Sequence, residues 1–353
     1  MKKTIRIILF VIAGLVVNSL VLVFVGFLFL QGCFNNIFRR SVYDENHVAM
    51  KYEDVEWKYK RELISFESGE NTLQGYYYGL EESKGLVVIS HGLSCGAATY
   101  FTETVYFLEH GYQVFAYDST GCHNSEGDNC VGLVQSALDL DAALTYIESD
   151  DRFDDLPVFL YGHSWGGYAV TAVHNFDHNV QAAVSVAGYN EPMEKMTEWG
   201  TSLVGIAYYL EKPFIQNQQK NIFGDKYNMT AVDGINNTDV PILIIHGTKD
   251  DVVPFDGSSI IAHKEEITNP NVEYRVYDED GKNGHGDMYL NYDAVAAYEE
   301  RYNYYVELYN ANNGVLSDET WFQFNTEMLE LKVALLDEKF MQDVLNFYEN
   351  SIR

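Results

Sequence analysis

The chain is poor in proline and in basic residues. Its 353 residues include only 6 prolines, and this scarcity argues against long disordered linkers. Lysine and arginine total 23 against 52 aspartates and glutamates, which gives a net charge of −29. Nucleic-acid binding is not expected, because phosphate contacts require basic clusters and none follows the N-terminal segment. We interpret the negative charge as a contribution to solubility rather than as a sign of a cationic substrate.

Cysteines are too few and too widely spaced for the common metal and redox motifs. The four are Cys33, Cys95, Cys122 and Cys130, and no two form a Cys-X-X-Cys pair. Zinc sites and thioredoxin-type sites are therefore not expected, and we predict that neither a metal nor another cofactor is needed. Cys122 and Cys130 lie in one expected loop, where either a disulfide or two thiols remain open.

A long apolar run occupies residues 7–30 and is interrupted only by Asn18 and Ser19 near its centre. It is long enough to cross a bilayer, which takes about 20 residues. We predict that residues 1–40 form an uncleaved single-pass membrane anchor. Basic residues at positions 2, 3 and 6 favour a cytoplasmic N-terminus and an extracytoplasmic domain, although positions 39 and 40 oppose this. The sequence Leu-Gln-Gly-Cys at 30–33 keeps lipoprotein processing open, and a buried helix of a soluble protein is the third alternative.

Short apolar runs alternate with helical periodicity over the rest of the chain. Strands are expected at 63–66, 73–78, 85–90, 112–117, 157–161, 180–186, 242–245 and 272–277, and helices at 99–110, 131–148 and 165–174. Continuous apolar runs of this length are typical of strands buried in a parallel sheet. The alternation predicts an α/β fold, with a mostly parallel sheet flanked by helices on both faces.

Two segments do not fit the strand–helix alternation. Residues 189–239 are rich in aromatic residues and methionine, and we interpret them as a cap inserted over the site, because long insertions in compact α/β domains tend to be lids. A surface excursion without substrate contact is the alternative. From about residue 290 a helical extension is expected, which makes 55–353 one domain. Two apolar stripes in the extension are interpreted as core packing: Tyr298, Tyr302, Tyr305 and Leu308, and then Met328, Leu331, Leu335 and Phe340.

The most informative motif is Gly162-His163-Ser164-Trp165-Gly166, which follows the apolar run 158–161 and precedes an expected helix. This layout is typical of a nucleophile elbow, in which a serine sits on a sharp strand-to-helix turn. The glycines avoid collisions with the neighbouring strand and helix. The helix N-terminus beyond the serine favours a developing oxyanion. A serine on a glycine-rich turn without a catalytic role is the alternative.

An activated serine needs a base, and the base needs an acid that orients it. Asp250 and Asp251 follow the apolar run 242–245. His285, bracketed by glycines, lies in the loop after the strand expected at 272–277. The chain order Ser, Asp, His, each after a buried strand, is the order expected of α/β hydrolases.

Over residues 60–310 the chain resembles α/β-hydrolase-fold serine hydrolases. Four segments carry the resemblance: 90–93, 118–127, the elbow, and the loops that hold Asp250 and His285. The chain is most similar to the branch of serine aminopeptidase-like proteins, monoacylglycerol-lipase-like enzymes and related carboxylesterases. An arginine that this family often carries near Ser119 or Thr120 is missing, and a Cys122–Cys130 pair is one substitute for it.

The resemblance implies a role for each site residue. Ser164 is implied as the nucleophile, His285 as general base and acid, and Asp250, rather than Asp251, as the residue that orients His285. The resemblance also implies an oxyanion hole made by the backbone N–H groups of Leu93 and Trp165. Trp199 and Tyr189 are the candidate substrate-binding residues.

The leading hypothesis is hydrolysis of a carboxylic ester through an acyl-enzyme intermediate. The cap aromatics favour an apolar acyl or aryl group: Trp199, Tyr208, Tyr209 and Phe214. A serine aminopeptidase-like exopeptidase acting on short peptides is the first alternative. It requires an acidic cap residue to hold a charged terminus, for which Glu191, Glu194 and Glu198 are the candidates. A membrane-tethered binding protein without catalytic activity is the second alternative.

Overall fold

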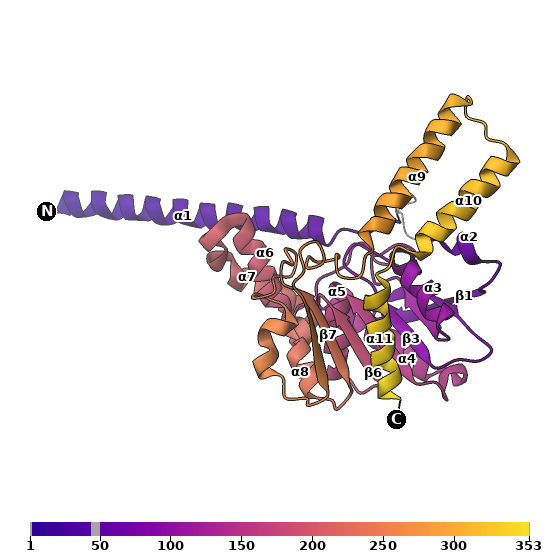
Figure 1. The fold of residues 1–353 in the computed structure, drawn as a ribbon. Helices are drawn as coiled ribbons and strands as arrows, with labels where there is room; N and C mark the ends of the chain where they lie inside the picture. Colours follow the sequence, from indigo (N-terminus) through magenta and orange to yellow (C-terminus); the bar gives the residue numbers. More distant parts are fainter. Residues whose placement is uncertain (1, 44–49, 353) are drawn as a thin grey trace.

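A computed structural model describes residues 2–43 and 50–352. Residues 1 and 353, the outer limits of the expected anchor and domain, lie outside the described residues. Figure 1 shows an α/β body from which two elements project: the N-terminal helix α1 (Lys2–Ile37) on one side, and the paired helices α9 (Tyr292–Ala311) and α10 (Asp318–Val333) on another.

An eight-stranded sheet forms the centre of the body, in the order β1-β2-β4-β3-β5-β6-β7-β8. Its strands are β1 (Arg61–Ser68), β2 (Asn71–Tyr78), β3 (Leu86–Ser90), β4 (Gln113–Tyr117), β5 (Val158–His163), β6 (Ala182–Val186), β7 (Ile242–Gly247) and β8 (Val272–Tyr277). β2 pairs antiparallel with β1 and β4, and the remaining neighbours pair in parallel. All eight expected strands are present, with small shifts at their ends. The predicted mostly parallel sheet is confirmed.

Helices cover both faces of the sheet, and each face has its own apolar core. On one face lie α3 (Phe101–Glu109) and α11 (Glu338–Ser351). On the other lie α4 (Gln135–Glu148), α5 (Trp165–Ala172) and α8 (Ala231–Asn236). Strands β3 to β7 are buried along their whole length as a result, which explains why they are continuous apolar runs.

Short helical segments complete the chain. They are α2 (Tyr52–Val55) and the 3-10 turns η1 (Ala97–Tyr100), η2 (Asp151–Phe153), η3 (Val173–Asn175), η4 (Gly205–Ala207), η5 (Gly224–Asn228) and η6 (Ile260–Glu266). Two of them belong to helices expected from the sequence. The turn η1 leads directly into α3, the helix expected at 99–110, and η3 directly follows α5, the helix expected at 165–174.

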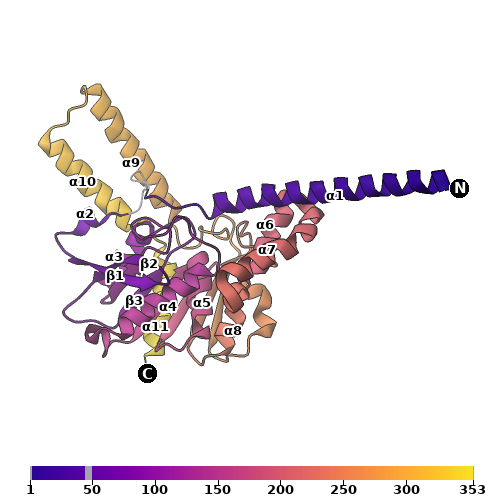
Figure 2. The same ribbon diagram turned by 180° about the vertical axis from the view of Figure 1, so that it is seen from behind.

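The segment expected to form the cap contains α6 (Pro192–Val204) and α7 (Tyr208–Phe223), which lie beside the end of α1 in both ribbon views (Figures 1 and 2). Phe27 of α1 packs edge to face on Phe214 of α7, with ring centroids 6.1 Å apart. The amides of Gln31 and Gln218 exchange hydrogen bonds of 2.5 and 3.0 Å. The end of α1 is therefore part of the folded body.

The first part of α1 stands free of the body. Every described side chain from residue 3 to residue 22 is exposed. α1 is long and apolar enough to cross a membrane, and a signal sequence near an N-terminus meets the same criteria.

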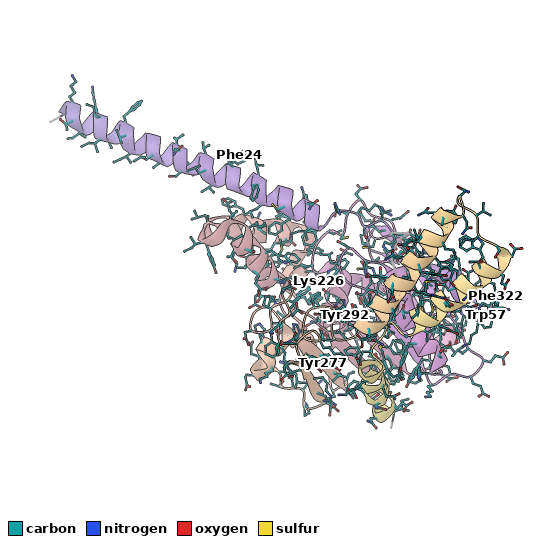
Figure 3. The ribbon with its side chains drawn as sticks, turned by 45° about the horizontal axis from the view of Figure 1, so that its top comes forward. Phe24, Trp57, Lys226, Tyr277, Tyr292 and Phe322 are labelled. Carbon is teal, nitrogen blue, oxygen red and sulfur yellow. The ribbon has the colours of Figure 1, made fainter. Side chains whose placement is uncertain are left out.

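The helices α9 and α10 lie side by side and project away from the sheet, and Figure 3 shows Phe322 of α10 on this projection. Core packing was expected for both apolar stripes of this region, and for the first it is wrong in part. Tyr302 is 44% exposed, and Tyr305 packs against Phe324 of the partner helix, with ring centroids 5.0 Å apart. The apolar stripes of α9 and α10 are buried mainly between these two helices. Phe340 lies in α11 and is buried in the body.

Candidate active site

Ser164 occupies the sharp turn between β5 and α5. Its backbone has φ +58° and ψ −112°, a conformation that residues with a side chain seldom adopt. A Cβ atom added at Gly162 would lie 2.2 Å from the carbonyl oxygen of Gly166, and one added at Gly166 would lie 1.9 Å from that of Ser90. The two glycines of the motif are therefore required by close backbone contacts on either side of the serine.

The structure brings Ser164, His285 and Asp250 together in one hydrogen-bonded line. His285, in the loop after β8, has Nε2 2.9 Å from Ser164 Oγ. Its Nδ1 lies 2.8 Å from Oδ2 of Asp250, which follows β7. The side chain of Asp250 is fully buried, whereas the neighbouring Asp251 is exposed. Of the two adjacent carboxylates, only Asp250 contacts His285.

Asp250 is embedded in hydrogen-bond donors. Its Oδ1 accepts the backbone N–H groups of Val252 and Val253 at 2.9 and 2.7 Å. Nε2 of His246, in β7, lies 3.2 Å from Oδ2. Burial alone raises the pKa of Asp250, but the hydrogen bonds with His246, His285 and Val253 outweigh it and hold the pKa below its ordinary value. The carboxylate is therefore ionised near neutral pH and accepts the Nδ1–H of His285.

A second set of hydrogen bonds supports the elbow from the other side. The hydroxyl of Tyr100 accepts the N–H of Gly92 at 3.1 Å and lies 2.7 Å from Nδ1 of His163. Nε2 of His163 lies 3.0 Å from the carbonyl oxygen of His285. Burial lowers the pKa of His163 to about 3, so this ring is neutral and holds the His285 loop in place. Neither Tyr100 nor His246 was found from the sequence. Tyr100 contacts His163, which is distant along the chain, whereas His246 is close to Asp250 in the sequence but carries no motif that marks it as its partner.

Two backbone N–H groups next to Ser164 have no acceptor among the residues that the structure describes. Trp165 is the first residue of α5, where an N–H has no partner within the helix. Leu93 lies in the turn after β3, and neither its N–H nor that of Trp165 donates to another described residue. Both residues line the pocket that contains Ser164 and His285. The two groups are therefore available to an oxygen bound there.

The pocket has a volume of about 460 Å³. Both candidate binding residues, Tyr189 and Trp199, line it. The other cap aromatics named in the sequence analysis do not: Tyr208 is buried within the cap, and Tyr209 and Phe214 are exposed. No aspartate or glutamate is found among the described lining residues.

The loop 118–127 is held by an arginine that sequence reasoning missed. The guanidinium of Arg40 donates to the carbonyl oxygens of Gly127, His123 and Ser125 at 2.5, 2.9 and 2.8 Å. This cation comes from the N-terminal segment instead of from position 119 or 120. Cys122 and Cys130 are buried as thiols, with sulfur atoms 3.5 Å apart.

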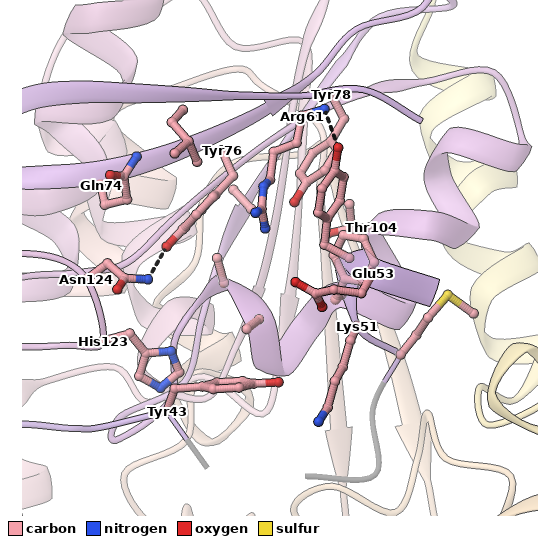
Figure 4. Close-up of a pocket in the computed structure, with 17 residues that line it drawn as sticks. Tyr43, Lys51, Glu53, Arg61, Gln74, Tyr76, Tyr78, Thr104, His123 and Asn124 are labelled. Carbon is pink, nitrogen blue, oxygen red and sulfur yellow. Dashed lines mark hydrogen bonds between the residues drawn. The ribbon is translucent and has the colours of Figure 1, made fainter. Parts of the chain in front are cut away.

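A second cavity, of about 600 Å³, is lined by Tyr76 and Asn124 among others and contains none of the three aligned residues (Figure 4). Asn124 donates to the hydroxyl of Tyr76 at 2.7 Å, and that hydroxyl donates to Asp118 at 2.8 Å. Asp118 also accepts the N–H of Ala97 at 2.8 Å. Asp118 therefore joins three segments and has no contact with the pocket of Ser164. Within the described parts of the chain, no three His, Cys, Asp or Glu residues cluster as a metal site requires.

Comparison with known proteins gives relatives for parts of the chain. Residues 81–221 match the family described as serine aminopeptidase, S33. A polyketide transferase of a Penicillium species is 27% identical over 119 residues, which cover 33% of this chain and 40% of the relative. Caffeoylshikimate esterase of Arabidopsis thaliana is 35% identical over 89 residues, which cover 24% of this chain and 27% of the relative. The chain thus matches less than half the length of these curated relatives.

A solved structure extends the likeness to most of the fold. An esterase of Pyrococcus furiosus superposes with a TM-score of 0.53 at 17% sequence identity. The superposition covers 78% of this chain and 98% of that protein.

Proposed function

We propose that this chain is a serine hydrolase of the α/β-hydrolase superfamily and that it cleaves carboxylic esters through an acyl-enzyme intermediate. The observation that carries the proposal is the line of hydrogen bonds from Asp250 through His285 to Ser164, 2.8 and 2.9 Å long. This line ends at a pocket that also presents two unpaired N–H groups. In this proposal these groups supply the nucleophile, the base, the orienting acid and the oxyanion donors that acyl transfer requires.

In the first half-reaction Ser164 Oγ bonds to the ester carbonyl carbon while His285 Nε2 takes the hydroxyl proton. The carbonyl electron pair moves onto oxygen, where the N–H groups of Leu93 and Trp165 stabilise the negative charge. One such donor contributes about 3 kcal/mol in other acyl-transfer enzymes. When the carbonyl re-forms, the bond to the alcohol oxygen breaks and His285 returns the proton to the departing alcohol.

In the second half-reaction a water molecule replaces the alcohol. His285 takes a proton from the water as its oxygen bonds to the acyl carbon. Collapse of this second intermediate breaks the bond to Ser164 Oγ, which recovers its proton, and the carboxylic acid is released. Asp250 stays ionised throughout and stabilises the imidazolium of His285.

The charges around the pocket favour an ester over the substrate of an aminopeptidase. An aminopeptidase holds a free ammonium group, which calls for a carboxylate in the pocket. The three candidate glutamates have other partners: Glu191 accepts from Asn228, Glu194 pairs with His263, and Glu198 pairs with Lys195. None of the three lines the pocket.

We further propose that residues 1–40 anchor the domain 55–353 to a membrane. Within this domain, residues 189–239 form the cap over the site, and a helical extension begins at about residue 290. The exposed part of α1, residues 3–22, is about 30 Å long, which matches the hydrocarbon core of a bilayer. Lys3 and Arg6, at the N-terminal end of this part, favour an extracytoplasmic domain. Digestion of intact cells with an external protease tests the orientation, since only an outward-facing domain is cleaved.

Detergent-solubilised full-length protein tests the enzymatic proposal. We expect para-nitrophenyl butanoate to be hydrolysed with a higher kcat/KM than alanine para-nitroanilide. Ser164→Ala should lower kcat by a factor on the order of 10⁶. Faster turnover of the anilide would favour the aminopeptidase, and turnover that Ser164→Ala leaves unchanged would contradict both activities.

A further inference from the structure

The wall of the active-site pocket includes the end of the N-terminal helix. Asn36 and Ile37, at the end of α1, and Arg39 just beyond it line the pocket together with Ser164. Phe38, which lies between Ile37 and Arg39, is buried in the body. Burial in the body is enough to explain why this residue is apolar. The segment expected to serve only as an anchor therefore also forms part of the site.

Contacts on both sides hold Arg39 in position. The ring of Phe38 packs edge to face on Trp199 of α6, with ring centroids 6.3 Å apart. The carbonyl oxygen of Phe38 accepts the N–H of Cys130 at 2.8 Å, and Arg39 forms an antiparallel bridge with Asn129. Arg40 is fixed by its three hydrogen bonds to the loop 118–127. A ligand that binds Arg39 would thus meet a backbone that is already ordered, which lowers the entropic cost of binding.

The guanidinium of Arg39 is exposed and has no carboxylate partner among the residues that the structure describes. Arg40, which bonds to backbone carbonyl oxygens, and Arg61, which lies over the ring of Tyr52, likewise have no carboxylate partner among the described residues. Three other arginines do pair with carboxylates: Arg152, Arg275 and Arg301. The pocket's other cation, Lys195, is buried and pairs with Glu198 at 2.8 Å. Arg39 is therefore a cation at the edge of the pocket with no carboxylate partner among the described residues.

We propose that Arg39 binds an anionic group, a carboxylate or a phosphate, on the ester substrate; this proposal rests on the ester hydrolysis proposed above. A guanidinium offers donors in a planar fork that matches both anions. Leu93 and Trp199 supply apolar wall for the rest of the substrate. The substrate class is then an ester with an apolar part and one negative charge, either a small soluble molecule or a lipid with an anionic headgroup.

Two pairs of substrates test this with the full-length protein in detergent. The soluble pair is mono-para-nitrophenyl glutarate and para-nitrophenyl pentanoate, whose acyl chains differ by a terminal carboxylate. The lipid pair is monooleoylglycerol phosphate and monooleoylglycerol. For each pair the readout is the ratio of kcat/KM for the anionic ester to that for the neutral one. Arg39→Met should lower this ratio about tenfold or more in one of the pairs, and Arg39→Lys should recover part of it.

Arg275→Met is the matched control, because it removes the same charge from an exposed position on β8. It should leave both ratios unchanged. An effect of Arg39→Met in the soluble pair indicates a small carboxylate ester, and an effect in the lipid pair indicates a headgroup phosphate. Ratios that Arg39→Met leaves unchanged, or that Arg275→Met lowers equally, would overturn the role of Arg39 while hydrolysis dependent on Ser164 still stands. Absence of any hydrolysis dependent on Ser164 would instead remove the proposed function itself.

Discussion

The guanidinium of Arg40 donates to the carbonyl oxygen of Ser125 at 2.8 Å, across 85 positions of the sequence. With its bonds to His123 and Gly127, this contact makes the N-terminal segment a structural part of the α/β body. The loop that Arg40 holds lies between β4 and α4 and also contains Cys122.

Arg40→Met should lower the free energy of unfolding by roughly 1–3 kcal/mol, because three carbonyl oxygens lose a charged donor. The measurement is urea denaturation followed by tryptophan fluorescence. Arg275→Met, whose partner Glu273 is an exposed neighbour on the same strand, should change the stability by less than about 0.5 kcal/mol. Equal effects of the two variants would show that the loop does not depend on Arg40.

Asp250 and Asp251 form a natural test pair, because they are adjacent but differ completely in burial. Asp250→Asn should lower kcat by about 10⁴, since an amide cannot hold the imidazole of His285 in its reactive tautomer. Asp251→Asn should change kcat by less than about twofold, since Asp251 is exposed. Steady-state ester hydrolysis by both variants, with folding checked by circular dichroism, makes the comparison. A larger loss of kcat in Asp251→Asn than in Asp250→Asn would show that Asp251, and not Asp250, orients His285.

Glu103 of α3 is buried, and burial raises its pKa to about 7. Because the folded pKa lies above the unfolded value near 4.5, the contribution to stability is complete below about pH 4.5 and is lost as the pH rises through 7. Glu103→Gln stays neutral and avoids this loss, which is roughly 3 kcal/mol. Relative to wild type, the variant should therefore gain stability between about pH 5 and pH 8.

Urea denaturation at the two ends of this pH range measures the gain in Glu103→Gln. The control is Glu109→Gln on the same helix, because Glu109 is 42% exposed and pairs with Lys58. A difference from wild type that stays constant with pH in Glu103→Gln would mean that this carboxyl is ionised in the folded protein.

The sheet and the elbow could be predicted because their signals are local. Strands β3 to β7 are buried on both faces, so each is a short apolar run, and the glycines around Ser164 are dictated by backbone atoms within a few ångströms. Ser164, Asp250 and His285 were selected by the glycine motif around the serine, by the order of the three along the chain and by the resemblance to α/β hydrolases. The structure brings these three side chains within hydrogen-bond distance of one another.

The remaining features depend on contacts between distant segments. Nothing near Arg40 in the sequence marks it as a partner of the loop 118–127, and nothing near Tyr100 marks it as a partner of His163. The stripe containing Tyr302 and Tyr305 shows that a helix has an apolar face, but not that this face meets a neighbouring helix outside the body. Phe340 was assigned to the stripe of Met328, although Asp337 caps a new helix, α11, between them.

Covalent labelling of Ser164 tests the central claim most directly. A fluorophosphonate reacts with a serine hydroxyl only where a base and an oxyanion site activate it. We predict that digestion and mass spectrometry will place the adduct of the folded full-length protein on Ser164, and that His285→Ala will abolish labelling. An unlabelled Ser164 in well-folded protein, or an adduct on another serine, would contradict the account.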